Sequence, residues 1–525
     1  MLSEFTPFLV PLPLVTAAAA AFLAAGRRPR HSYWFAAAGA LGALVAACVA
    51  AVALLLDGPA TGSLAGGPLG WLSVRLDAVS AVMLLLVAFV GWVVLRYTRT
   101  YLDGEARQGP FTGWLCLTLA CVMLLVAAGN LFQLLAAWVA TSLSLHRLLL
   151  FYPDRAAARR AARKKYLVAR TGDIALAGAV ALLLGAYDTA DIATILAAAR
   201  AGEGGTVAGG AAALLAVAAV LKSAQFPTHG WLTEVMETPT PVSALLHAGV
   251  INAGGLLLIR FADVMLLAPV VLGALVVVGA GTALIGGLVM LTQPAVKTSL
   301  AWSTVAQMGF MILECGLGLF SLALLHIVAH SLYKAHAFLA SGGAVERVVA
   351  LRRPGPAAAP GVGTVALAFA VAAAVYAVVT YALGSTAKSP QSIALGAILV
   401  FGVADLLAQG WAGLGPHRLA PRMLAWAAAT SLSYFLLQAA AVRLTAGTLP
   451  AAPAPGPLEW LLMAATVLAF GAVATAQVLL PRWRAHPAAV RLRVHLSNGL
   501  YANAVFDRLT GGWSTRRRLT TETER

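Results

Sequence analysis

The chain contains 525 residues, of which 60% are hydrophobic and only 11% are charged, whereas soluble domains carry roughly 25% charged residues. This composition predicts a polytopic, all-α membrane protein and leaves no room for a sizeable soluble domain. The formal net charge of +16 does not indicate nucleic-acid binding, because the basic residues gather in the loops between apolar segments, where membrane topology explains them better.

Apolar segments of bilayer-spanning length predict about fifteen transmembrane helices. The start of the chain, MLSEFTPFLV, lacks a basic region and a clear cleavage site, so we expect it to form a retained first span. The predicted spans lie near residues 6–25, 33–56, 74–95, 111–128, 131–151, 166–186, 208–226, 241–261, 267–291, 296–315, 318–342, 363–384, 391–412, 422–441 and 458–480.

The connections between these spans alternate in charge. Basic connections lie at 27–31, 96–107, 154–165, 346–353 and 417–422, and neutral or acidic ones lie at 57–67, 187–205 and 445–459. Because basic loops stay in the cytoplasm, we expect an odd number of spans, with the amino terminus outside and the carboxyl terminus inside the cell. The basic tail, residues 482–525, is expected to form an interfacial amphipathic helix followed by a frayed end.

The most informative stretch is LKSAQFPTHGWLTEVMETPTPVSALLHAGVINAGGLLLIR, residues 221–260. It carries Lys222 at the end of an apolar segment, then Pro227, and then His247 inside the next apolar run. The proline predicts that the helix breaks near Phe226. One reading of Lys222 is a side chain that snorkels to the interface. An ionisable residue beside a broken membrane helix is more typical of a functional site.

Polar residues recur on one face of each of the two later spans. In the span at 296–315, the spacing places Ser299, Ser303, Gln307 and Glu314 on one helical face, with Lys297 at its head. In the span at 318–342, three side chains follow at intervals of four residues, and these are His326, His330 and Lys334. Such residues either form buried hydrogen bonds between helices or line a path for protons. The number of intramembrane charges favours the path.

Neither the histidines nor the cysteines predict a metal site. Two histidines four residues apart can bind zinc, but no third ligand accompanies His326 and His330. The cysteines lie scattered in apolar segments without a CxxC pair, at Cys48, Cys116, Cys121 and Cys315. We therefore expect no metal, no cofactor and no disulfide framework in this chain.

The stretch at 222–260 resembles the signature of the antiporter-like subunits of respiratory complex I and of multisubunit cation/proton antiporters. VKTSLAWSTVAQMGF, HIVAHSLYKAHAFLASG and YLVARTGDIAL resemble further motifs of that family, over roughly residues 70–345. The resemblance implies two inverted five-helix repeats, each with a broken helix. It divides the chain into amino-terminal helices (1–110), a first repeat that breaks between Lys222 and Pro227 (111–262), a second, inverted repeat (263–415), and carboxyl-terminal helices with a basic tail (416–525).

The same resemblance implies a proton pathway. Lys222 matches the lysine of the first broken helix, and Asp173 matches the family's acidic residue on the sixth span. Lys388, just before Pro390, could match the lysine of the second broken helix, although the motif around it is not preserved. The remaining implied pathway residues are His247, Lys297, His326, His330 and Lys334, which form the central relay, together with Glu234 in the GWLTEVMETPTP segment.

One departure from the respiratory subunits distinguishes among relatives. Their fifth span carries Gly-Trp-Glu, whose glutamate pairs with the broken-helix lysine, but here Trp138 is followed by Val139. His146 lies seven residues later on the same helical face and is the nearest titratable substitute. This segment, together with the terminal HLSNGLYANAVFDRL, resembles the DabB subunits of inorganic-carbon-accumulating complexes.

That resemblance implies a transporter subunit of the bacterial inner membrane rather than an enzyme. Its partner would be a DabA-type subunit similar to zinc-dependent β-carbonic anhydrases, and influx of protons, or of Na⁺, would drive hydration of carbon dioxide there. Two alternatives remain. One is a proton-pumping subunit of a respiratory NADH-quinone oxidoreductase, a hydrogenase or a Na⁺/H⁺ antiporter complex. The other is a scaffold with a degenerate channel, marked by the missing glutamate.

Overall fold

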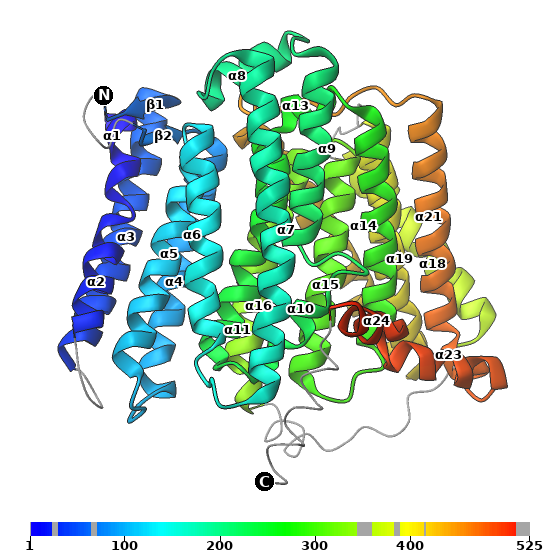
Figure 1. Cartoon of the computed structure of the whole chain (residues 1–525). Helices are drawn as coiled ribbons and strands as arrows, with labels where there is room; N and C mark the ends of the chain where they lie inside the picture. Colours follow the sequence, from blue (N-terminus) through cyan, green and yellow to red (C-terminus); the bar gives the residue numbers. More distant parts are fainter. Residues whose placement is uncertain are drawn as a thin grey trace.

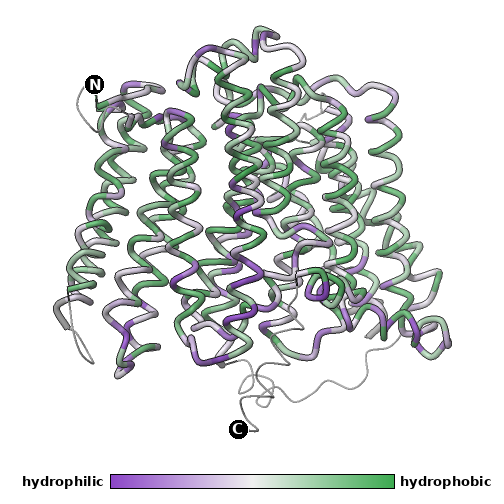
Figure 2. The backbone as a smooth tube through the Cα atoms, viewed as in Figure 1, coloured by the Kyte–Doolittle hydropathy of each residue, from purple (hydrophilic) through white to green (hydrophobic). Residues whose placement is uncertain are grey.

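The computed structural model describes residues 2–23, 30–64, 71–343, 360–382, 389–413 and 416–510. Long helices stand side by side in a single bundle (Figure 1). Helix α1 and the β1–β2 hairpin lie at one end of the bundle, called here the hairpin end, and α24 lies near the other, called the α24 end. Hydrophobic residues cover most of the helical length, and hydrophilic residues gather toward the α24 end (Figure 2).

The elements follow one another with short connections. The first part of the chain contains α1 (Leu2–Leu9), α2 (Leu12–Leu23), α3 (Arg30–Asp57), β1 (Ala60–Ser63), β2 (Ser73–Leu76), α4 (Ala78–Tyr101), α5 (Gln108–Val126), α6 (Leu131–Leu149), α7 (Ala156–Tyr187) and α8 (Ile192–Arg200). The central part contains α9 (Gly205–Lys222), α10 (Gly230–Thr233), η1 (Val235–Glu237), α11 (Thr240–Ala248), η2 (Val250–Asn252), α12 (Ala253–Arg260), α13 (Ala262–Leu266), α14 (Pro269–Met290), α15 (Val296–Gly316) and α16 (Phe320–Leu339). The last part contains η3 (Ala340–Gly343), α18 (Val362–Ala382), α19 (Pro390–Gly413), α20 (Pro416–Leu444), α21 (Pro457–Val478), α22 (Leu480–Trp483), α23 (Pro487–Ser497), η4 (Gly499–Tyr501) and α24 (Ala502–Leu509).

The predicted all-α membrane architecture is confirmed. Within the described residues, 13 helices are long and apolar enough to cross a membrane. Every one of the predicted spans coincides with a helical segment, including α6 and α15, which are not among those 13. The exact number of crossings and the two inverted repeats stay predictions, as do the domain bounds at residues 110, 262 and 415.

The helix that carries Lys222 ends four residues earlier than predicted. Helix α9 stops at Lys222, Ser223 caps it, and Ala224 takes a left-handed conformation with φ of 47°. The reason is that a proline ring clashes with the carbonyl four residues before it. For Pro227 that carbonyl belongs to Ser223, so the helix ends there rather than at Phe226.

The span at 240–260 is also irregular. Helix α11 ends at Ala248, and Gly249 departs from helical geometry with φ of −128° and ψ of −78°. The short 3₁₀ helix η2 follows before α12 resumes the span. His247 therefore lies one turn from an interruption in its own helix.

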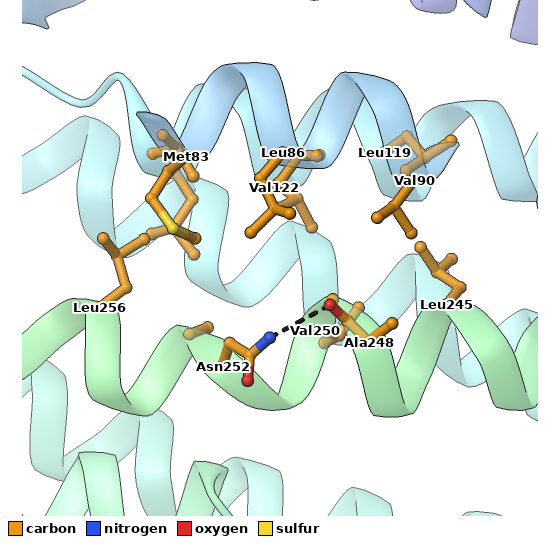
Figure 3. Close-up of a pocket in the computed structure, with 15 residues that line it drawn as sticks. Met83, Leu86, Val90, Leu119, Val122, Leu245, Ala248, Val250, Asn252 and Leu256 are labelled. Atoms are coloured by element: carbon orange, nitrogen blue, oxygen red, sulfur yellow. Dashed lines mark hydrogen bonds between the residues drawn. The ribbon is translucent and has the colours of Figure 1, made fainter. Parts of the chain in front are cut away.

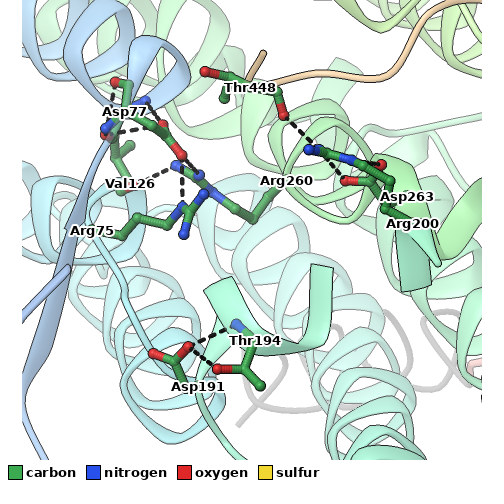
Figure 4. Close-up of polar contacts among 10 residues, drawn as sticks. Arg75, Asp77, Val126, Asp191, Thr194, Arg200, Arg260, Asp263 and Thr448 are labelled. Atoms are coloured by element: carbon green, nitrogen blue, oxygen red, sulfur yellow. Dashed lines mark hydrogen bonds and ion pairs between the residues drawn. The ribbon is translucent and has the colours of Figure 1, made fainter. Parts of the chain in front are cut away.

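An ion pair closes the hairpin end of the bundle. Asp77 caps α4 through a capping box with Ser80, and Arg260, at the end of α12, donates a hydrogen bond to the Asp77 carboxylate (Figure 4). Arg75 donates to the same carboxylate over 2.8 Å. Burial alone raises the pKa of Asp77, but Arg260 and Arg75 outweigh it and hold the pKa at about 2. Asp77 is therefore a permanently charged structural anchor.

A second ion pair fastens α8 to α13 near the same end. Arg200 contacts both carboxylate oxygens of Asp263, over 3.0 and 2.9 Å, and donates to the carbonyl of Thr448 over 3.3 Å (Figure 4). A bidentate pair of this kind fixes geometry as well as charge. It ties the first half of the chain to the connection between α20 and α21.

Candidate functional site

Lys222 lies buried at the end of α9, against helices α6 and α7. Its ammonium nitrogen is 4.4 Å from the centre of the Trp138 ring, and the Asp173 carboxylate acts on it electrostatically. Trp138 Nε1 donates a hydrogen bond to Asp173 over 3.0 Å, and Arg170 lies 2.6 Å from the other carboxylate oxygen. The structure thus brings together two of the predicted residues, Lys222 and Asp173, through a tryptophan.

A second buried lysine, Lys165, lies on α7 and was not predicted as a site residue. Its ammonium donates to the carbonyl of Ser142 over 2.6 Å and to the Ser142 hydroxyl over 2.9 Å. It acts electrostatically with Lys222 and Asp173. Lys165 lies eight residues before Asp173, which is close to two helical turns, so the spacing could have found it.

His146 lies in a different environment from the one that its predicted role requires. Its ring centre is 5.5 Å from that of Tyr166, and its charged neighbours are cations: Lys165, Arg147 and Arg170. None of the polar contacts in the described part of the chain joins His146 to Lys222. Its role as a substitute for the missing glutamate stays a prediction, and the geometry favours Asp173 as the counter-charge of Lys222.

A second group of predicted residues meets where α11, α15 and α16 pack together. His247 Nδ1 and Thr304 Oγ1 are 3.0 Å apart, and the Thr304 hydroxyl donates to the carbonyl of Leu300 over 3.0 Å. Since that hydroxyl has a single hydrogen, His247 must donate from Nδ1, which leaves Nε2 as the acceptor nitrogen. Lys334 donates to the same Leu300 carbonyl over 3.0 Å, and His330 Nε2 donates to the His247 carbonyl over 3.1 Å.

This group, the His247 cluster (His247, Thr304, His330 and Lys334), is enclosed by protein. All four side chains are buried, and His247 also stacks on Phe338 with ring centres 4.3 Å apart. A hydroxyl that both donates and accepts can pass a proton between neighbours. Thr304 links two titratable groups in this way, although its apolar surroundings in the sequence gave no sign of it.

The polar series continues toward α20 through an ion pair. His326 Nδ1 lies 3.1 Å from the Glu314 carboxylate, and the His326 and His330 rings are 6.1 Å apart. Glu314 also lines a cavity between α15, α19 and α20, whose wall includes Thr430 and Tyr434. Glu314 was placed on the polar face of its span by sequence, but its role as the partner of His326 was not predicted.

Three predicted residues fall outside these groups. Lys297 is half-buried at the start of α15 and donates to Thr240 over 3.0 Å, far along the helix from the His247 cluster. Lys388 lies outside the described residues. The predicted polar face of α15 is only partly inward, because Gln307 is exposed while Glu314 is buried. The physical reason is that Thr304, one residue off that face, turns toward His247.

The Lys222 site and the His247 cluster are separate groups. No polar contact among the described residues joins Lys222 to His247. Between α4, α5 and the interrupted span lies a mostly apolar cavity, into which Asn252 is the polar exception (Figure 3). Asn252 donates to the Ala248 carbonyl over 3.1 Å and to Ser331 over 2.8 Å, so it stabilises the interruption after His247.

Glu234 lies at the α24 end, just beyond α10. Its carboxylate is 2.7 Å from the ammonium of Lys164, which is only 4% exposed. Asp507, on α24, lies 2.7 Å from the same ammonium. The structure therefore gives the predicted Glu234 two charged neighbours that sequence reasoning did not connect, one of them from the far end of the chain.

Comparison with known proteins agrees with this arrangement. The family model described as NADH:quinone oxidoreductase/Mrp antiporter matches residues 128–353, and the model for the amino terminus of complex I chain 5 matches residues 71–112. Among solved structures, a chain of the Mrp complex from Dietzia sp. DQ12-45-1b superposes with a TM-score of 0.67 at 25% identity, over 98% of this chain and 60% of that one.

Curated relatives narrow the family. The probable inorganic carbon transporter subunit DabB of Hydrogenovibrio crunogenus is 47% identical over 55% of this chain, and the match covers only 56% of that relative. The probable subunit DabB2 of Halothiobacillus neapolitanus is 39% identical over 83% of this chain and 80% of that relative. The chain therefore belongs to the DabB inorganic carbon transporter subunits, within the NADH:quinone oxidoreductase/Mrp antiporter family of membrane proteins.

Proposed function

We propose that this chain is the cation-conducting membrane subunit of a two-component complex that accumulates dissolved inorganic carbon. The observation that supports conduction is the buried Lys222 at the end of a broken helix, with Trp138 and Asp173 against it. Buried ionisable groups of this kind are costly in a membrane unless they serve a path for ions. The likeness to DabB subunits supports the link to inorganic carbon.

The proposed mechanism divides the work between two proteins. In this chain, protons move among the Lys222 site, the His247 cluster and the pair of His326 with Glu314. The partner, a DabA-type zinc protein similar to β-carbonic anhydrases, hydrates carbon dioxide to bicarbonate. The complex lies in the bacterial inner membrane, with the α24 end of the bundle facing the cytoplasm, where the basic connections belong.

A growth experiment tests this proposal. The chain is expressed with its partner in cells that lack carbonic anhydrase, and growth at ambient carbon dioxide is measured. We expect Lys222→Met to abolish growth while the complex still assembles, because the variant keeps an apolar stem but cannot carry a proton. Lys222→Arg should fail as well, since a guanidinium does not release its proton at neutral pH.

The control is Arg508→Gln, which removes an exposed charge on α24 and should grow like the wild type. Wild-type growth of Lys222→Met would overturn the proposed path. Copurification of the chain with flavin or iron–sulfur subunits, instead of a zinc protein, would move it to the respiratory alternative.

A further inference from the structure

The carboxyl-terminal helix α24 packs against the connection that follows the broken helix. It lies beside α10 and α15 at one end of the bundle (Figure 1). Asn503 donates to Thr233 over 3.3 Å, and its side-chain oxygen occupies the space where a side chain at Gly230 would lie. Nearby, Gly499 lies against Trp302, whose ring centre is 4.5 Å from that of His229. The tail is thus part of the structure around the segment that leads to Lys222.

The charged contact in this region joins three groups, called here the Lys164 cluster. The Lys164 ammonium lies 2.7 Å from Glu234 and 2.7 Å from Asp507, and it is 5.7 Å from the centre of the Phe506 ring. Lys164 is 4% exposed, whereas the two carboxylates are 31% and 33% exposed. One buried cation is therefore shared by two half-exposed anions from different helices.

The charge of this cluster decides how easily Glu234 takes up a proton. With all three groups ionised the cluster carries one negative charge, and with Glu234 protonated it is neutral. Burial raises the pKa of Glu234 most strongly, Lys164 lowers it, Asp507 raises it and Arg160 lowers it. Without Asp507, protonation of Glu234 would leave a buried ammonium unpaired, which is unfavourable.

We propose that Asp507 is a positioning residue for proton exchange at Glu234: it keeps the Lys164 ammonium paired, so that Glu234 can bind and release a proton at the α24 end of the pathway. This inference rests on the proposed proton conduction and deepens it. It gives the carboxyl-terminal helix a role in the pathway, at a point where water and the connection after the broken helix meet.

The proposal predicts shifts of opposite sign for two variants. Asp507→Asn removes the anion that favours the protonated form, so the midpoint for Glu234 should move toward acid by about one pH unit. Lys164→Gln removes the cation that favours the ionised form, so the midpoint should move toward alkaline pH by a similar amount. Asp507→Glu keeps the charge and should return the midpoint toward the wild-type value.

The experiment follows the protonated-carboxyl infrared band of the purified full-length chain during a pH titration. The difference between wild type and Glu234→Gln identifies the Glu234 contribution. Asp154→Asn is the matched control, because Asp154 is an exposed aspartate on the same side of the bundle, and it should leave the midpoint unchanged. Uptake by the complex is then measured against pH for the same variants, and its midpoint should move in the same direction.

The two readouts separate the inference from the proposed function. An infrared midpoint that is unchanged in both Asp507→Asn and Lys164→Gln, or that moves in the same direction in both, overturns the role of Asp507. Opposite infrared shifts in a chain whose complex takes up no inorganic carbon would support the positioning role and overturn the proposed function instead. If Lys164→Gln does not fold, Asp507→Asn with its Asp507→Glu rescue decides the question, because Asp507 is only half-buried.

Discussion

A lysine buried in a membrane needs a counter-charge or a hydrogen-bonding partner, because an unpaired ammonium is costly there. In the resembling respiratory subunits a glutamate of the fifth span fills this role, and Val139 stands in its place here. The structure offers Asp173, which acts on Lys222 from α7. Trp138 lies between them, with its ring face toward the ammonium and its N–H bonded to the carboxylate.

Asp173→Asn and His146→Gln test which residue answers the charge of Lys222. Asp173→Asn keeps the shape of the side chain but removes its charge, so uptake should fall by at least tenfold, equivalent to about 1.4 kcal/mol. His146→Gln should lower uptake by less, because the neighbours of His146 are cations and none of its described contacts reaches Lys222. Uptake is measured in assembled complexes over a range of pH. A normal rate in Asp173→Asn together with a shifted pH profile in His146→Gln would restore the histidine as the substitute.

The individual residues show what a sequence can reveal. Lys222, His247, His330 and Lys334 were predicted because charged residues in apolar segments stand out, and the structure places all four in the interior. Thr304 was missed because threonine is unremarkable in a helix. Its importance comes from the partner that it faces, and a single sequence does not specify that partner.

At the scale of elements, the tightest packing joins α14 to α15, and glycines make it possible. A side chain at Gly309 would lie 2.8 Å from the carbonyl oxygen of Gly279 and 2.9 Å from Thr282 Cβ. Small residues let membrane helices approach closely where the apolar surroundings supply no other driving force. This packing holds α15, and with it Thr304 and Glu314, at a fixed distance from the rest of the bundle.

Gly309→Ala and Gly281→Ala make a matched test of that packing. Alanine favours a helix over glycine by about 1 kcal/mol. At Gly281, where no atom lies within 4 Å of the added carbon, the exchange should be neutral or slightly stabilising. At Gly309 the added carbon meets backbone atoms, and overpacking costs about 1–3 kcal/mol, so the unfolding temperature in detergent should fall. Equal unfolding temperatures for the two variants would show that α14 and α15 can separate without cost.

Element boundaries divide into those that local chemistry sets and those that it does not. Pro227 predicted the break after Lys222, and its only error was the exact end of α9, which the clash with the Ser223 carbonyl explains. The interruption at Gly249 was not predicted, because a glycine in an apolar run is common. Tertiary contacts, such as that between Asn252 and Ser331, stabilise the irregular backbone.

At the scale of the whole molecule, the two ends of the bundle differ in how they are fastened. The hairpin end is fastened by Arg260 with Asp77 and by Arg200 with Asp263. The α24 end is fastened by Lys164 with Glu234 and Asp507. The charge of the connections predicted which loops share a side. It could not predict the pairing of Lys164 with Asp507, because the two lie near opposite ends of the chain and only the folded bundle brings them together.

Single cysteines on these two ends test the orientation of the bundle. Ser63→Cys changes an exposed residue at the end of β1, and Ala156→Cys changes an exposed residue at the start of α7, next to the basic stretch at 154–165. The background variant is Cys48→Ala, because Cys48 is exposed while Cys116, Cys121 and Cys315 are buried. Since basic connections stay in the cytoplasm, a membrane-impermeant maleimide should label Ser63→Cys in intact cells. It should label Ala156→Cys only after the membrane is opened. Labelling of both cysteines in intact cells would mean that an odd number of helices does not separate them across the membrane. Labelling of Ala156→Cys alone would reverse the orientation and place Glu234 and Asp507 outside the cell.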